Sequence, residues 1–194
     1  IKSPMIREMI FNLASAERQL NNVKTAVECV ERARKRFPDW TPMNLHLTWF
    51  YSKYGDIQRA EEARKRGALI WDRWGDDSPD RIHHDAMTKA WILNAQGKYA
   101  DAEPLHRKAI HYARTTKVGK TPRLLRADLS AYAMNLMHQD RLVEAEIAAR
   151  EALLMSLDMF GKQSFNSAAH GRNLAKVLMK QGRHRDAQTL LETM

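Results

Sequence analysis

A short turn motif that recurs along the chain is the feature that most constrains its fold. Each copy places a turn residue five positions before an alanine and lies between two apolar runs with helical periodicity. Successive copies begin 34, 42, 43 and 42 residues apart, at Asn21, Gly55, Gly97, Asp140 and Gly182. A regular period of this size is typical of helical hairpins that stack into a solenoid. The sequence therefore predicts a repeat architecture.

The apolar residues on both sides of each turn predict a pair of helices. Clusters of turn residues separate these pairs, and no stretch has the pattern of a strand. We expect ten helices in five hairpins, at residues 7–38, 41–74, 80–116, 122–159 and 163–194. Because a repeat array grows by adding neighbours, we expect one continuous all-α domain over residues 1–194.

The composition is that of a folded chain and predicts no membrane span. Hydrophobic residues make up 44% and charged residues 28%, and charge interrupts every apolar run well before the length of a transmembrane helix. The chain begins at Ile1 rather than methionine and ends at Met194 within a helical pattern, so we expect a fragment of a longer protein. We expect a cytoplasmic location, with removal of a targeting segment as the alternative.

The turn motif and its flanks resemble the tetratricopeptide repeat. In the second hairpin the resemblance rests on Leu47, Tyr51, Gly55 and Ala60, and related patterns occur in the fourth and fifth. The longer steps are similar to the 42-residue repeats of kinesin light chains and many bacterial regulatory proteins, most clearly in residues 96–105. Three positions depart from the pattern, which leaves their packing open: Lys89 at a usual leucine site, and Arg64 and His106 at usual large apolar sites.

The resemblance implies a right-handed α-solenoid of about five hairpins whose first helices line a concave groove. It also implies a non-enzymatic scaffold for protein–protein interaction, within a bacterial regulatory or assembly protein, that binds a peptide or protein segment in that groove. The family's groove positions fall here on Trp49, Lys53, His84, Met87, Trp91, Asn94, Ser130, Met134, Met137, His138, Arg172, Lys176 and Lys180. Aromatic, methionine and cationic side chains suit an extended or helical peptide with apolar residues and some acid. The alternative for Trp91, Met134 and Met137 is that they fill space between helices.

Nucleic acid and self-association are the alternative modes of binding. The net charge of +9 includes a strip around one helix end and the following linker: His106, Arg107, Lys108, His111, Arg114, Lys117, Lys120, Arg123 and Arg126. Such a strip can track phosphates, but it is not interleaved with aromatic residues for base stacking, and much of the charge also suits ordinary helix surfaces. The end hairpins lack a neighbour on one side, so pairing with another chain is a further possibility.

The sequence shows no motif for catalysis, a cofactor or a metal. The neighbours His83, His84 and Asp85 point different ways on a helix, and no histidine follows at the i+4 spacing of a two-ligand face. Cys29 is the single cysteine, so it cannot form an intramolecular disulfide. We therefore expect a protein that is not an enzyme and that binds no cofactor or metal.

Overall fold

The computed structural model describes residues 22–38, 41–74, 79–115 and 122–194. These residues contain nine helices and no strand, which confirms the predicted all-α repeat fold. They belong to two compact units, residues 1–77 and 78–194. The first predicted helix, within residues 7–38, begins outside the described residues, and the single continuous domain stays a prediction.

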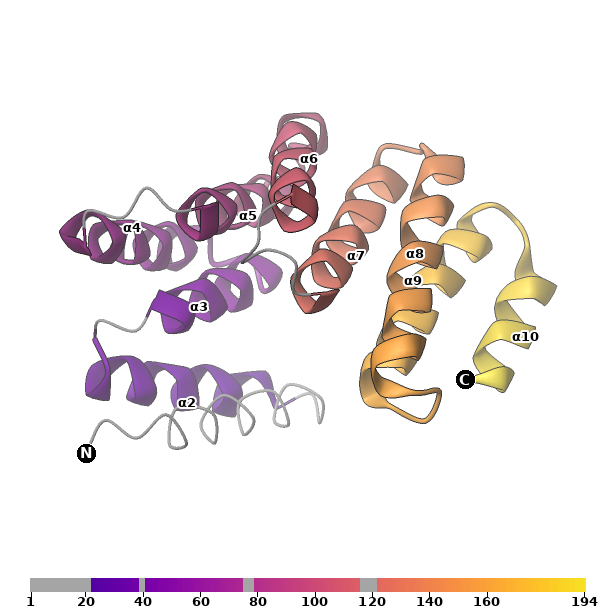
Figure 1. The fold of residues 1–194 in the computed structure, drawn as a ribbon, viewed down its shortest axis with the longest axis horizontal. Coiled ribbons are helices and arrows are strands. Elements are labelled where there is room, and N and C mark those ends of the chain that lie inside the picture. Colours follow the sequence, from indigo (N-terminus) through magenta and orange to yellow (C-terminus); the bar gives the residue numbers. More distant parts are fainter. Residues whose placement is uncertain (1–21, 39–40, 75–78, 116–121) are drawn as a thin grey trace. The chain divides into compact units, whose positions relative to one another are not determined.

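Unit 1 contains a helical hairpin and one helix before it (Figure 1). Its helices are α2 (Val23–Arg36), α3 (Thr41–Lys53) and α4 (Ile57–Trp74). Gly55, with a φ of 80°, forms the turn between α3 and α4. The hydroxyl of Tyr51 donates to the carboxylate of Glu31 at 2.9 Å, which joins α3 to α2. The core residues of this unit include Ala26, Val30, Ala33, Met43, Leu47, Phe50, Ala60 and Ala63.

Unit 2 is a stack of three helical hairpins (Figure 1). Its helices are α5 (Pro79–Ala95), α6 (Tyr99–Thr115), α7 (Pro122–His138), α8 (Leu142–Phe160), α9 (Phe165–Lys180) and α10 (His184–Thr193). The hairpins turn at Gly97, Asp140 and Gly182, where φ is 76°, 59° and 78°. After each turn, a backbone N–H returns to the carbonyl five residues earlier, as from Arg183 to Leu178 at 2.9 Å. This bond closes a helix end at a left-handed residue, so the turn motif has a direct structural cause.

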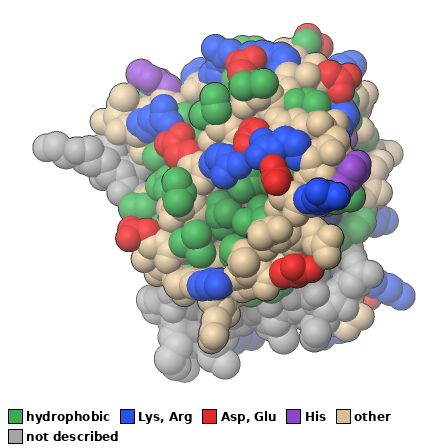
Figure 2. Space-filling model, turned by 90° about the vertical axis from the view of Figure 1, so that its right-hand side faces the viewer, with side chains coloured by type: hydrophobic (Ala, Val, Ile, Leu, Met, Phe, Trp, Pro, Cys, Tyr) green, Lys and Arg blue, Asp and Glu red, His purple; other side chains and the backbone are tan. Residues whose placement is uncertain are grey.

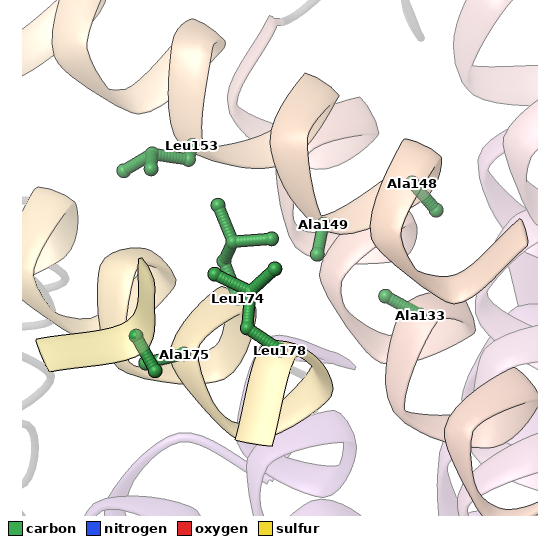
Figure 3. Packing of buried hydrophobic residues seen from close by; sticks show 8 residues of the cluster. Ala133, Ala148, Ala149, Leu153, Leu174, Ala175 and Leu178 are labelled. Carbon is green, nitrogen blue, oxygen red and sulfur yellow. The ribbon is translucent and has the colours of Figure 1, made fainter. Parts of the chain in front are cut away.

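Alanines at the helix crossings let the helices of unit 2 approach closely. Six of them are at most 2% exposed: Ala90, Ala133 and Ala175 on the first helices, and Ala102, Ala145 and Ala187 on the second. Figure 3 shows the place where α7, α8 and α9 meet, with Leu174 and Leu178 packed beside Ala133, Ala149 and Ala175. Large side chains from one helix thus fill the space that small side chains on its neighbours leave.

A charged contact, here called the clasp, joins each hairpin of unit 2 to the next. In the first clasp, the carboxylate of Glu103 on α6 accepts from Arg141 at 2.5 Å and from Gln139 at 3.4 Å. The second clasp has the same parts one period later: Glu146 on α8 accepts from Arg183 at 2.9 Å and from Gln181 at 3.0 Å. The clasp therefore follows the sequence repeat.

The three residues that depart from the repeat pattern have different environments. Lys89 is exposed and pairs with Asp85 at 2.7 Å, so its position faces solvent in this hairpin. Arg64 is half-buried, and its Nε donates to Glu61 at 2.9 Å. His106 is 0% exposed and is a polar residue within the core.

Candidate functional site

In unit 1, the two predicted groove residues lie next to each other on α3. The Nζ atom of Lys53, which is exposed, lies 5.0 Å from the centre of the Trp49 ring. Trp49 is half-buried and meets Phe50 edge-on, with ring centroids 5.2 Å apart. A partly exposed aromatic ring beside a cation is a suitable contact for a peptide, and the place of this pair in a groove stays a prediction.

On α5, two of the four predicted groove residues are buried. Met87 is 2% exposed because it packs with Ala86 and with Ala109 of α6. His84 is 8% exposed and lies one turn earlier on the same side of the helix. Met87 and His84 therefore lie on the side of α5 that belongs to the core, and their contact with a ligand stays a prediction.

The other two α5 residues are half-buried, and one of them is held in a polar network. Trp91 packs against the Met87 cluster. The side-chain oxygen of Asn94 accepts from the side-chain amide of Asn135 at 2.7 Å. The side-chain nitrogen of Asn94 lies 2.9 Å from Nε2 of His106. Burial lowers the pKa of His106 to about 4, so its ring is neutral and accepts the Asn94 amide hydrogen. Asn94 thus connects α5, α6 and α7.

On α7, one predicted groove residue is buried and three keep some exposure. Ser130 is 8% exposed, and its hydroxyl accepts from Asn173 of α9 at 3.0 Å, while its contact with a ligand stays a prediction. Met134 and Met137 are half-buried against the core cluster around Leu136. His138 is exposed and stacks on Tyr99, with ring centroids 4.6 Å apart.

Cations converge where α7 meets α9. Partial burial lowers the pKa of His138, and the neighbouring ammonium groups of Lys180 and Lys176 lower it further. Lys180 donates to the carbonyl of Met137 at 2.8 Å and pairs with Asp140 at 2.7 Å. Arg172 and Lys176 are exposed and form no ion pair with any residue that the structure describes. This basic cluster, His138, Arg172, Lys176 and Lys180, is the most accessible part of the predicted groove.

The predicted phosphate-binding strip is not continuous. His106 is 0% exposed and Arg126 is 7% exposed, so the prediction is wrong for these two, whose side chains lie in the core. Arg107 and Arg114 are exposed, but each pairs with a glutamate at 2.7 Å. Lys117, Lys120 and the side chain of Arg123 lie outside the described residues.

His83, the first of the two neighbouring histidines on α5, connects this helix to α7. His83 Nε2 lies 2.7 Å from the carboxylate of Asp128 on α7, which is 2% exposed. Burial raises the pKa of Asp128, and the contact with His83 opposes this shift. Within the described ranges, no group of three or more metal-binding side chains lies close enough to hold an ion. The helices in those ranges also include none that is long and apolar enough to cross a membrane.

A cleft that the sequence reasoning missed lies between α6 and α8. It has a volume of about 600 Å³, and α7 forms its floor through Leu129, Tyr132 and Leu136. The signal that reveals it is a small residue on α8. Ala148 lines the cleft, whereas Leu190 stands at the same point of the next repeat, 42 residues later.

The last hairpin also exposes apolar side chains. Phe165 is 42% exposed, Met179 is 51% exposed and Leu191 is 47% exposed. Figure 2 shows the side of unit 2 on which α10 lies, where apolar side chains gather between charged ones. Self-association through the end hairpins stays a prediction.

Comparison with known proteins places this geometry among helical repeats. Residues 87–116 match the tetratricopeptide repeat family model. No curated protein matches the sequence significantly. A Podosopora anserina structure, described as kinesin light chain nearly identical TPR-like repeats, superposes with a TM-score of 0.55 at 19% identity, covering 100% of this chain and 95% of that one.

Two further structures share the fold. BtubC (BKLC) from P. vanneervenii has a TM-score of 0.63 at 18% identity, over 90% of this chain and 71% of that one. The apo form of RapI has a TM-score of 0.56 at 12% identity, over 93% of this chain and 50% of that one. At these identities the likeness is one of fold.

Proposed function

Because the chain carries a tetratricopeptide repeat and has the fold of kinesin-light-chain-like repeats, we propose that it is a non-enzymatic scaffold that binds an acidic peptide segment along its first helices. The fold in general is that of a protein-interaction scaffold. The 42-residue repeat variety leads us to propose further a cytoplasmic bacterial regulatory or assembly protein as the parent. The observation that carries the peptide proposal is the basic cluster on α7 and α9.

The basic cluster offers cations that a ligand can reach. The ammonium groups of Lys176 and Lys180 are close enough to the His138 ring to lower its pKa. Lys176 and Arg172 are exposed and have no carboxylate partner among the described residues. A carboxylate ligand would lower the repulsion between these cations as well as pair with them.

Apolar contacts lie on the same helices as the basic cluster. Met134 and Met137 are half-buried on α7, and Trp91 is half-buried on α5. Methionine adapts to differing partners, and tryptophan is a frequent anchor in interfaces. A segment with acidic and apolar residues therefore matches this surface better than a nucleic acid, since the predicted phosphate strip is interrupted by buried and paired side chains.

The proposal is tested by selecting peptides from a display library against the purified chain and measuring their affinity by fluorescence anisotropy. Lys176→Glu should weaken an acidic ligand about tenfold or more, because it replaces an attraction by a repulsion. Lys108→Glu is the matched control, since Lys108 is exposed on the second helix α6. Equal loss in both variants, or selection of peptides without acidic residues, would contradict the proposal.

A single-stranded oligonucleotide serves as the competing ligand. If it binds tightly with a steep dependence on salt while no peptide is selected, nucleic-acid binding replaces the proposal. Light scattering over a range of protein concentrations separately tests self-association.

A further inference from the structure

The cleft between α6 and α8 is a built feature of unit 2 that the proposed function does not use. We propose that it is a second docking site, which receives the apolar side of an amphipathic helix from a partner protein, with acidic residues on one flank of that helix and basic residues on the other. The walls of this site lie on the second helices α6 and α8, whereas the proposed peptide groove lies on first helices. The two proposals therefore stand independently.

The cleft has an apolar floor and charged side chains along its walls. The floor consists of side chains from α7, and Ile110 of α6 and Ile147 of α8 contribute apolar walls. Arg114 on the α6 wall pairs with Glu151 on the α8 wall at 2.7 Å. A hollow of about 600 Å³ with this lining has the size and character of a ligand site.

Stacking of hairpins does not by itself leave such a cleft. The next junction lies between α8 and α10. There, Leu190 occupies the repeat position of Ala148, and Leu157 occupies the repeat position of Arg114. Both leucines pack against the hydrophobic cluster formed by α7, α8, α9 and α10. The first junction is therefore open because its own residues are small or charged at positions that its repeat neighbour fills.

The helix beside the cleft has an uncovered apolar side. Val143, Ile147 and Leu154 are 71%, 63% and 66% exposed, and their spacing places them along one stripe of α8. The opposite side of α8 is buried through Ala145, Ala149 and other residues. A helix that is apolar on both sides is expected to be covered on both, and Ile147 lies both on this stripe and at the rim of the cleft.

The two walls of the cleft carry opposite charges, which defines the occupant. Arg107 and Arg114 lie two turns apart on the α6 wall, and Glu144 and Glu151 lie two turns apart on the α8 wall. A helix in the cleft therefore meets cations on one flank and carboxylates on the other, and it shares each of them with a present partner: Arg107 with Glu103, Glu144 with Arg141, and Arg114 with Glu151. The Arg114–Glu151 pair spans the cleft with both side chains about half exposed, so separating it costs little.

The helical form of the occupant follows from the same spacing. The lining residues recur every three or four positions on both walls over two turns, a length of about 10 Å. A helix presents apolar side chains at the same interval, so that residues at i, i+4 and i+7 can enter one hollow.

The experiment uses the whole 194-residue chain and three synthetic helical peptides. All three peptides carry the same leucine stripe, and their flanks are mixed in sign, wholly acidic or wholly basic. Fluorescence anisotropy measures affinity, and methyl NMR spectra report contact at Ile110 and Ile147. We expect the mixed peptide to bind most tightly and to shift the signals of both isoleucines.

Two substitutions close the cleft in different ways. Ala148→Leu places there the residue that the next repeat uses, and Ile147→Glu puts a charge on the exposed rim. Each should weaken the mixed peptide about tenfold or more, the loss expected when a buried aliphatic contact is removed. Thr189→Glu is the matched control, because Thr189 is the exposed equivalent of Ile147 at the filled junction.

The proposal is overturned if the three peptides bind alike, if none binds, or if both cleft variants bind as the unsubstituted chain does. It is also overturned if light scattering shows a dimer that Ala148→Leu dissociates, because the occupant is then a second copy of this chain. Thermal unfolding identifies any variant that has lost its fold, and Ile147→Glu changes a side chain that is mostly exposed and so tests the site without disturbing the core.

Discussion

Replacement of His106 by leucine should remove a large part of the pH dependence of stability. His106 is 0% exposed at a site that is usually apolar in this repeat, and burial lowers its pKa to about 4 from the ordinary 6.5. Below pH 6.5 the histidine of the unfolded chain therefore binds a proton, whereas the buried ring of the folded chain stays neutral. Stability is complete above pH 6.5 and falls as the pH decreases towards 4.

The size of the effect follows from the shift in pKa. A difference of this size corresponds to about 3 kcal/mol once the pH lies below the pKa values of both the unfolded and the folded chain, and to about 2 kcal/mol between pH 7.5 and pH 5. His106→Leu removes this loss. At pH 7.5 it also removes the hydrogen bond from the half-buried Asn94 amide, which contributes about 1 kcal/mol, but it removes as well the buried Nδ1 of His106, which has no hydrogen-bond partner. The variant should therefore be close to the unsubstituted chain at pH 7.5 and more stable at pH 5.

Urea unfolding followed by circular dichroism at a series of pH values measures this difference. His170, whose pKa burial also lowers to about 4, titrates in both proteins and cancels in the comparison. Met87→Leu is the control, because it changes the same core region without a titrating group and should alter stability equally at all pH values. Parallel pH curves for His106→Leu and the unsubstituted chain would refute the reasoning.

Three further substitutions test the turns and the clasp through thermal or chemical unfolding. Gly182→Ala should lower stability by about 1 kcal/mol, because φ there is 78° and no neighbouring atom compensates for the strain of a side chain. Gly171→Ala should leave stability unchanged or raise it by up to about 1 kcal/mol. Gly171 lies within a helix, and the new methyl group meets only the flexible side chain of Met194 at 3.0 Å. A loss of more than about 1 kcal/mol would show that Met194 cannot move. Glu146→Gln should lower the free energy of unfolding by about 1 kcal/mol and speed amide hydrogen exchange in α10, because an uncharged amide replaces the carboxylate that pairs with Arg183 in the second clasp. Unchanged exchange in α10 would show that the clasp does not hold the last hairpin.

The sequence was sufficient to predict the repeat fold because turns carry a strong local signal. A residue with positive φ, followed five positions later by a small residue, is required by the geometry of each hairpin. Gly97 and Gly182 meet the first condition without strain, and Asp140 meets it as a polar residue that tolerates the left-handed region. These positions depend on short stretches of chain, and so a single sequence contains the necessary information.

The candidate site was less predictable because exposure depends on contacts between hairpins. Met87 and Ser130 occupy positions that the family turns towards its groove, but here they meet α6 and α9. The open cleft depends on the size of Ala148 relative to its repeat equivalent, Leu190. A position-by-position comparison of the repeats would have found that difference, whereas the periodicity of apolar residues alone does not distinguish a filled junction from an open one.

The clasp gives the array of unit 2 a polarity. The acceptor lies on the second helix of one hairpin, and both donors lie at the turn of the following hairpin. The α7–α8 hairpin carries both halves, with Arg141 as donor and Glu146 as acceptor. A gene that encodes residues 122–163 twice in tandem would therefore supply a matching carboxylate and guanidinium at each new boundary. The array can in this way be lengthened by whole modules, and the engineered protein would need no new contact of this kind.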